Sequence, residues 1–320
     1  QPAVLADSIE LGRQDSAATG SRYATGIALS TNGRALYVAE NLSDSIAVID
    51  LASHRVMQRV GSGPYPYGIA VAPDGYVYVS AWGASFVNVY RATANGRLAA
   101  ERPIDVARHP STILLNADGS RLYAVSASTD RVAIVNTRAR HLIRLLADPP
   151  PDGAVEGSTP DALSLSPDES RLYVAEADAN AVAVFDLSAL SSGRATARGA
   201  DTLSGRIPTE WYPTALAMSR DSLLVVNGKG RGPGPNPAGP QPSTPRAKMD
   251  PRQYTLGQLD GTITVAPLAR DAELAAFTRR VAHANGWDIP RRAKASYPPF
   301  EHVIYVIKEN RTYDQVFGDL

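Results

Sequence analysis

Short stretches in which apolar and polar residues alternate dominate most of the chain. Each stretch holds an apolar run, a polar turn and a second run of the "LYVA" type. The five stretches are "TGIALSTNGRALYVAENLSDSIAVIDL", "YGIAVAPDGYVYVSAWGASFVNVYRA", "STILLNADGSRLYAVSASTDRVAIVNT", "DALSLSPDESRLYVAEADANAVAVFDL" and "TALAMSRDSLLVVNG". A period of two residues is typical of β-strands, so the chain is predicted to consist of repeated β units.

The spacing of the repeats indicates what kind of unit they form. Equivalent positions lie 42, 44, 50 and 53 residues apart, at Gly26, Gly68, Thr112, Ala162 and Ala215. This period fits a four-stranded propeller blade better than the shorter helical or leucine-rich repeats. The predicted fold class is therefore all-β, a β-propeller of four-stranded blades with five repeats visible.

Each repeat is predicted to open with a β-hairpin. The turns are Asn32-Gly33 and the Asp-Gly pairs that begin at Asp74 and Asp118, and such pairs tolerate the positive backbone angles of tight hairpin turns. A third strand follows the hairpin, as at Ser45–Asp50, and "RVMQRVG" at Arg55–Gly61 is predicted to be a fourth. Four antiparallel strands would complete one blade.

The fifth repeat and the beginning of the chain depart from this scheme. After "LLVVNG" comes "KGRGPGPNPAGPQPSTPRAKMDP", whose Gly and Pro content predicts a long loop, and "LDGTITVAPL" supplies the third strand later. "ADSIELG", Ala6–Gly12, is similar to a fourth strand. It either completes the fifth blade and closes a five-bladed ring, or it belongs to blades lost from a larger ring.

The repeated "SPDG…LYVA…VxVID" pattern resembles the YVTN-type, or YncE-like, β-propellers over about Ala24 to Leu268. Propellers of this family usually have seven blades, so the resemblance implies that two are missing. It implies no particular activity, because propellers are scaffolds for unrelated functions.

Composition and charge exclude several kinds of function. The chain has 32 basic and 32 acidic residues and no cysteine. A net charge of zero favours neither nucleic acid nor an anionic membrane as a partner, and thiolate chemistry and disulfides are excluded. No apolar run approaches the ~20 residues of a membrane span. The five histidines lie singly, so no cofactor is expected in the propeller.

Aromatic residues are predicted to gather at one face of the propeller. The loops between second and third strands, and those that enter the next blade, all return to the same face of the ring. Packing of the blade crossings would explain these residues, and so would a site for a protein or glycan partner. The predicted collar consists of Tyr65, Tyr67, Trp82, His109, Trp211 and Tyr212.

The pattern changes to a helical period after Leu268. An amphipathic helix is predicted over 271–286, followed by the Pro-rich connector "WDIPRRAKASYPP" and the apolar strand "HVIYVIK". This divides the chain into a propeller at 1–268, a helix and linker at 269–299, and the first strand of an α/β domain at 300–320. "ENRTYDQVFGD" ends that strand, and its acid and amide side chains suit either a hard cation or turns and caps.

The stretch "HVIYVIKENRTYDQVFGDL" resembles the opening of a phosphoesterase family that includes bacterial phospholipase C and acid phosphatase relatives, within the alkaline-phosphatase-like superfamily. The resemblance implies that Glu309 and Asn310 hold a divalent metal in an intact enzyme that hydrolyses phosphoesters. Thr312 stands where relatives often have Ser, and the nucleophile lies further along the chain in those relatives. The resemblance also implies a periplasmic or extracellular location.

These observations leave three functions open. The first is the propeller part of a bifunctional YncE-like/phosphoesterase protein, in which these 320 residues alone have no turnover. The second is a non-enzymatic binding propeller at the cell surface or in the periplasm. The third is a propeller lactonase or quinone-dependent dehydrogenase, which would require charged ligands that converge on the channel, and the sequence shows no such set.

Overall fold

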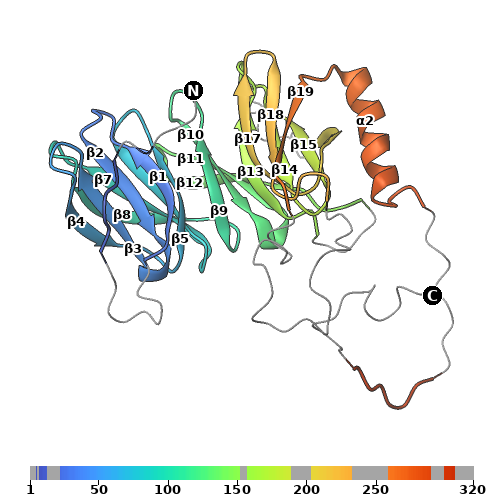
Figure 1. The fold of residues 1–320 in the computed structure, drawn as a ribbon, viewed down its shortest axis with the longest axis horizontal. Coiled ribbons are helices and arrows are strands. Elements are labelled where there is room, and N and C mark those ends of the chain that lie inside the picture. Colours follow the sequence, from blue (N-terminus) through green and yellow to red (C-terminus); the bar gives the residue numbers. More distant parts are fainter. Residues whose placement is uncertain are drawn as a thin grey trace. The chain divides into compact units, whose positions relative to one another are not determined.

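The computed structural model describes residues 5, 7–12, 22–151, 157–188, 203–232, 259–289 and 299–306. The chain divides into two compact units, Gln1–Asp288 and Ile289–Leu320. Over the described residues the strands of the first unit form five antiparallel sheets, each one propeller blade (Figure 1). The predicted all-β fold of repeated blades is thereby confirmed.

Four of the blades have four strands, paired in chain order. Blade 1 contains β1 (Ala24–Leu29), β2 (Ala35–Glu40), β3 (Ser45–Asp50) and β4 (Arg55–Gly61). Blade 2 contains β5 (Pro66–Val71), β6 (Tyr76–Ala81), β7 (Phe86–Ala92) and β8 (Leu98–Asp105). Blade 3 contains β9 (Pro110–Leu115), β10 (Arg121–Ser126), β11 (Arg131–Asn136) and β12 (His141–Ala147), and blade 4 contains β13 (Pro160–Leu165), β14 (Arg171–Glu176), β15 (Ala181–Asp186) and β16 (Leu203–Pro208).

Blade 5 has three strands in its described part: β17 (Pro213–Ser219), β18 (Ser222–Asn227) and β19 (Thr262–Pro267). Two short 3-10 helices, η1 (Asn41–Ser43) and η2 (Ala127–Thr129), lie between second and third strands, and the helix α2 spans Asp271–Ala284. The bounds predicted for the third and fourth strands of blade 1 and the late third strand of blade 5 agree with the structure.

The predicted hairpin turns are present. Gly33, Gly75 and Gly119 have φ angles of 68°, 85° and 70°, in the left-handed region that glycine adopts without steric cost. In blade 4 the equivalent residue is Glu169, with φ 55°. The turn geometry is therefore kept even where the sequence offers no glycine.

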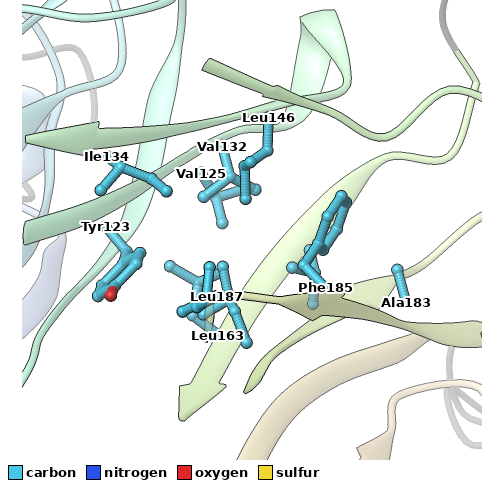
Figure 2. Packing of buried hydrophobic residues seen from close by; sticks show 11 residues of the cluster. Tyr123, Val125, Val132, Ile134, Leu146, Leu163, Ala183, Phe185 and Leu187 are labelled. Atoms are coloured by element: carbon cyan, nitrogen blue, oxygen red, sulfur yellow. The ribbon is translucent and has the colours of Figure 1, made fainter. Parts of the chain in front are cut away.

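Apolar residues fill the spaces between consecutive blades. Between blades 3 and 4, Val132 and Ile134 of β11 lie in one cluster with Leu163 of β13 and Phe185 of β15 (Figure 2). All four side chains are buried. Each junction therefore buries one face of a sheet against the first strand of the next, and a blade depends on its neighbours for much of its stability.

Helix α2 covers the outer strand of blade 4. Leu274 and Val281 are buried, and Thr278 Oγ1 accepts a hydrogen bond of 2.9 Å from the backbone N–H of Arg206 in β16. Glu273 closes the start of the helix by accepting from the backbone N–H of Arg270 at 3.0 Å. The predicted helix is confirmed, and it shields a strand edge that would otherwise be open to pairing.

Two expected strands do not form over the described residues. Residues 7–12 form no strand. Ile9 and Leu11 instead pack against Val38 and Ile49 on the outer face of blade 1, so this segment does not complete blade 5 or close a five-bladed ring. The strand expected at 302–308 is not formed at 302–306. A lone strand has no partner to hydrogen-bond, which explains its absence.

Candidate functional site at the propeller rim

One backbone feature recurs at the entrance to every blade. The residue before each first strand has a positive φ although none of the five is glycine. These rim residues are Tyr23 (50°), Tyr65 (53°), His109 (57°), Thr159 (51°) and Tyr212 (61°). This conformation costs roughly 1–2 kcal/mol for an L-residue. Residues held this way by their surroundings are often functional, so the rim is the first place to look for a site.

Side chains of the preceding blade hold several rim residues in place. Asp44 Oδ1 accepts from the backbone N–H of Tyr65 at 2.9 Å, and Asn180 Oδ1 accepts from that of Tyr212 at 2.8 Å. Asp130 Oδ1 accepts from the N–H of Thr159 at 3.0 Å. Each acceptor lies in the turn between second and third strands, so a side chain of blades 1, 3 and 4 orients the entrance of the following blade.

An aromatic cluster lies where the rim loops of blades 2 and 3 meet. The rings of Trp82 and His109 are stacked, with centroids 4.9 Å apart and planes inclined by 20°. Tyr65 meets the edge of Trp82 at 6.1 Å. His109 Nδ1 lies 2.6 Å from the hydroxyl of Ser128, which fixes the imidazole. Tyr65 and Trp82 remain 44% and 43% exposed, so they offer ring surface to a ligand.

Tyr67 lies apart from that cluster, on the inner strand β5. It lines a hollow of about 460 Å³, together with Tyr23, Thr25 and Thr112 of the neighbouring first strands. The first strands of blades 1 and 2 approach closely here, since a Cβ added at Gly26 would clash with the carbonyl oxygen of Tyr67. The volume is within the range of small-molecule sites.

Trp211 and Tyr212 form a second group on blade 5. Trp211 is 48% exposed and packs over Gly232. The ring of Tyr212 lies under the Lys229 ammonium, with Nζ 3.7 Å from the ring centroid, a favourable cation–π contact. No ring contact joins this group to Trp82 among the residues that the structure describes. The six residues of the predicted collar are therefore divided into the cluster of Tyr65, Trp82 and His109, the pair of Trp211 and Tyr212, and Tyr67 at the hollow.

Two acidic residues near Tyr212 were not singled out by the sequence analysis. Burial, and then the charge of Asp178, raise the pKa of Asp161 to about 7. Asp161 Oδ1 is buried and accepts no hydrogen bond from the described residues, while Asp178 accepts one from Thr159 Oγ1 at 2.5 Å. Other first strands have Thr25, Ser111 or Thr214 at the position of Asp161. The sequence signal that could have identified Asp161 is therefore an acidic residue at a position where the other first strands have a hydroxyl side chain.

A buried ionic group connects blades 3 and 4. Glu176 accepts two hydrogen bonds of 2.8 Å from Arg206 Nε, and Arg206 Nη2 lies 3.7 Å from Asp148 Oδ1. All three side chains are at most 3% exposed. Burial, and then the charge of Glu176, raise the pKa of Asp148 well above its ordinary value. One arginine thus stabilises two carboxyl groups deep in the junction.

The metal ligands predicted from the phosphoesterase resemblance, Glu309 and Asn310, lie outside the described residues. Thr312 lies there too. Within the part that the structure describes, no three His, Asp or Glu side chains gather as a metal site would require, and no helix is long and apolar enough to cross a membrane.

The class of protein that this architecture defines is a β-propeller with a polar and aromatic rim. Residues 9–128 match the family model described as the SMP-30/Gluconolactonase/LRE-like region. No curated protein matches the chain significantly.

Solved structures with a similar fold include three bacterial proteins. A Lactobacillus plantarum protein is 21% identical, with a TM-score of 0.55 over 64% of either chain. Putative 6-phosphogluconolactonases from Bacteroides uniformis (17% identical, TM-score 0.52, 62% of either chain) and Bacteroides fragilis (20%, 0.51, 62% of this chain and 61% of that one) are also similar. At these identities the likeness establishes the fold alone. The chain spans less than two thirds of the length of each.

Proposed function

We propose that this protein is a binding propeller whose rim recognises a glycan. The observation that carries the proposal is the cluster of Tyr65, Trp82 and His109, in which two half-exposed rings lie beside a fixed imidazole and the Ser128 hydroxyl. Sugar rings have apolar C–H faces that pack on aromatic rings, and hydroxyl groups that pair with polar neighbours. The hollow lined by Tyr67 contains none of Tyr65, Trp82 and His109, and the proposal does not require it.

The rigidity of the rim also supports recognition. Asp44 of the preceding blade holds the backbone N–H of Tyr65, whose ring meets the edge of Trp82, and Ser128 holds the imidazole of His109. A ligand that binds these rings therefore loses little affinity to the ordering of side chains, because they are already in place. The positive φ of Tyr65 and His109 recurs at the entrance of all five blades, so the repeat itself holds these two residues in a fixed backbone conformation.

The test is a glycan array probed with the purified protein, followed by titration of any glycan that binds. Trp82→Ala should weaken binding by about tenfold or more, as loss of a central aromatic contact does, and Tyr67→Ala should weaken it less. Trp287→Phe is the matched control, because Trp287 packs on Arg206 rather than at the rim. Equal binding by all variants, or capture of a protein partner instead, would contradict the proposal.

A second candidate is that the C-terminal segment begins a metal-dependent phosphoesterase domain, with the propeller as its recognition module. The stretch around Glu309 and Asn310 supports it, because an acid and an amide are suitable ligands for a hard cation. In a longer polypeptide that contains the nucleophile, Glu309→Gln should reduce hydrolysis of p-nitrophenyl phosphate at least 100-fold. The 320-residue chain should show none, and activity of that chain lost on Glu309→Gln would contradict the assignment.

Lactone hydrolysis is a third candidate, suggested by the family match over residues 9–128 and by the names of two similar structures. Asp161 supports it, because a carboxyl group with a pKa of about 7 is suited to proton transfer near neutral pH. Hydrolysis of gluconolactone or its 6-phosphate, lost in Asp161→Asn and kept in Asp186→Asn, would favour this candidate over glycan binding. Equal activity of the two variants would rule Asp161 out.

A further inference from the structure

A second hollow lies between the outer strands of blades 2 and 3. It has a volume of about 450 Å³, and its walls come from the end of β8 and from the turn that leads into β12. It shares no residue with the aromatic cluster or with the hollow lined by Tyr67. The charged or titratable residues that line this outer hollow are Arg102, Asp105, Arg140 and His141.

The part of the chain that forms the outer hollow is basic, although the whole chain has no net charge. Residues 91–147, which include β8, β11 and β12, contain nine arginines and four acidic residues. Residues 148–187, which follow directly, contain one arginine and nine acidic residues. The zero net charge therefore conceals a separation of charge between neighbouring blades, and the excess of arginine around the outer hollow favours an anionic ligand there.

Arg140 is held in place at the wall of the outer hollow. Its Nη1 atom donates a hydrogen bond of 2.7 Å to Glu101 Oε2, and its guanidinium lies over the ring of Tyr76, 4.8 Å from the centroid. Arg91 also lies over Tyr76, at 5.3 Å, and donates a hydrogen bond of 3.0 Å to its hydroxyl. A guanidinium fixed in this way binds an oxyanion with little loss of side-chain entropy, because its orientation is set before the ligand arrives.

The junction of blades 1 and 2 joins its outer strands in a different way. There Gln58 of β4 donates to the carbonyl oxygen of Leu98 in β8 and accepts from its N–H, both at 2.8 Å. The strand registers place Gln58 and Glu101 at equivalent positions of their blades. Blades 2 and 3 are thus joined at this position by two charged side chains, Glu101 and Arg140, rather than by contact with the backbone. The outer hollow is therefore a feature of this junction and not of the repeat.

We propose that the outer hollow binds an organic phosphate monoester. Arg102 and Arg140 offer two guanidinium groups to the phosphate, and His141 adds a ring N–H donor. Ile104 and Leu142 also line the hollow and belong to the apolar cluster between blades 2 and 3, so they can contact the carbon skeleton of the ester. Inorganic phosphate would fill only a small part of 450 Å³, which favours an ester over the free ion.

Two acidic side chains determine which anions can compete for these arginines. Glu101 occupies one donor of Arg140, and Asp105 lines the outer hollow. A phosphate monoester carries roughly two negative charges at neutral pH. It therefore attracts the arginines more strongly than a sulfate ester or a carboxylate, each with one charge, and the outer hollow should select phosphate over both.

The test is calorimetric titration of the 320-residue protein with phenyl phosphate, with phenyl sulfate and phenol as ligands of the same skeleton. We expect phenyl phosphate to bind most tightly. Arg102→Gln should weaken its binding by about tenfold or more, because a hydrogen bond to a charged group is lost. Arg97→Gln is the matched control, since Arg97 is an exposed residue of blade 2 that does not line the outer hollow.

Glu101→Gln should have the opposite effect and tighten the binding of phenyl phosphate by about threefold. The amide oxygen of glutamine can still accept from Arg140, while the charge that repels the phosphate is gone. A role of Glu101 in blade packing alone would not produce tighter binding. The position of the ligand can be followed through the imidazole NMR signals of the five histidines, among which that of His141 should shift and that of His109 at the rim should not.

Three results would overturn the proposal. The first is equal affinity of Arg102→Gln and Arg97→Gln for phenyl phosphate. The second is binding of phenol or phenyl sulfate as tight as that of phenyl phosphate, which would remove the selection for a doubly charged group. The third is a shift of the His109 signal without one at His141, which would place the ligand at the rim instead. None of these results depends on whether the rim binds a glycan.

Discussion

Blades 4 and 5 are adjacent copies of one repeat, and they differ in everything that surrounds the repeat. Blade 4 is covered on both faces, α2 packs over its outer strand, and it holds a buried arginine. Among the described residues, blade 5 has one covered face, three strands and two exposed aliphatic residues, Ile263 and Val265. The comparison shows that the repeat specifies the strands, while neighbouring blades determine how much each side chain contributes to stability.

The largest difference is expected from the arginines of the two blades. Arg206→Met leaves Glu176 buried without its cation, and should lower the free energy of unfolding by about 3–5 kcal/mol. Arg231→Met removes an exposed ion-pair partner of Glu210, 3.5 Å away. This substitution should change the free energy of unfolding by less than about 0.5 kcal/mol. Urea denaturation of the two variants measures both. Similar losses would mean that the ionic group in blade 4 is not buried in solution.

A matched pair of valines tests the covered and uncovered faces. Val184→Ala removes two methyl groups from a packed junction, and should cost about 2 kcal/mol from lost burial and the cavity left behind. Val265→Ala makes the same change on the exposed face, and should cost less than about 0.5 kcal/mol. Thermal unfolding is a sufficient readout. A large loss at Val265 would show that something in this chain covers blade 5.

The smallest effect concerns Asp161, at the start of blade 4. Its pKa is raised to about 7 in the folded protein, so the folded state binds a proton more tightly than the unfolded state does. Stability should therefore fall as the pH rises from about 4 to about 7. Between pH 5 and pH 8 the parent protein should lose about 1 kcal/mol of unfolding free energy through this group after solvent screening. Asp161→Asn should remove that loss. Identical pH profiles of variant and parent would contradict the burial of Asp161.

The strands and turns could be predicted from the sequence because they depend on local signals. Asn32-Gly33 and the equivalent pairs fix the hairpins, and alternating apolar residues fix the strands. The division of the aromatic collar could not be predicted, since strand parity assigns Trp82 and Trp211 to one face of the ring but not to one place on it. The pairing of Arg206 with Glu176 joins residues 30 positions apart across a blade, and no local pattern indicates it.

For residues 7–12 the sequence predicted a strand that the structure does not contain. "SIELG" has the composition of a strand, yet strand formation needs a partner edge, and Ile9 and Leu11 find an apolar face instead. Tertiary packing determined the outcome, as it does for most short apolar segments.

Trp82 and its neighbours Tyr65 and His109 are the proposed glycan site. The most direct measurement is the NMR spectrum of the three tryptophan indole N–H groups, at Trp82, Trp211 and Trp287, during titration with a glycan that binds. We expect the Trp82 resonance to shift with the bound fraction, while that of Trp287 stays in place. Saturable binding that leaves Trp82 unmoved and shifts only Trp211 or Trp287 would contradict it.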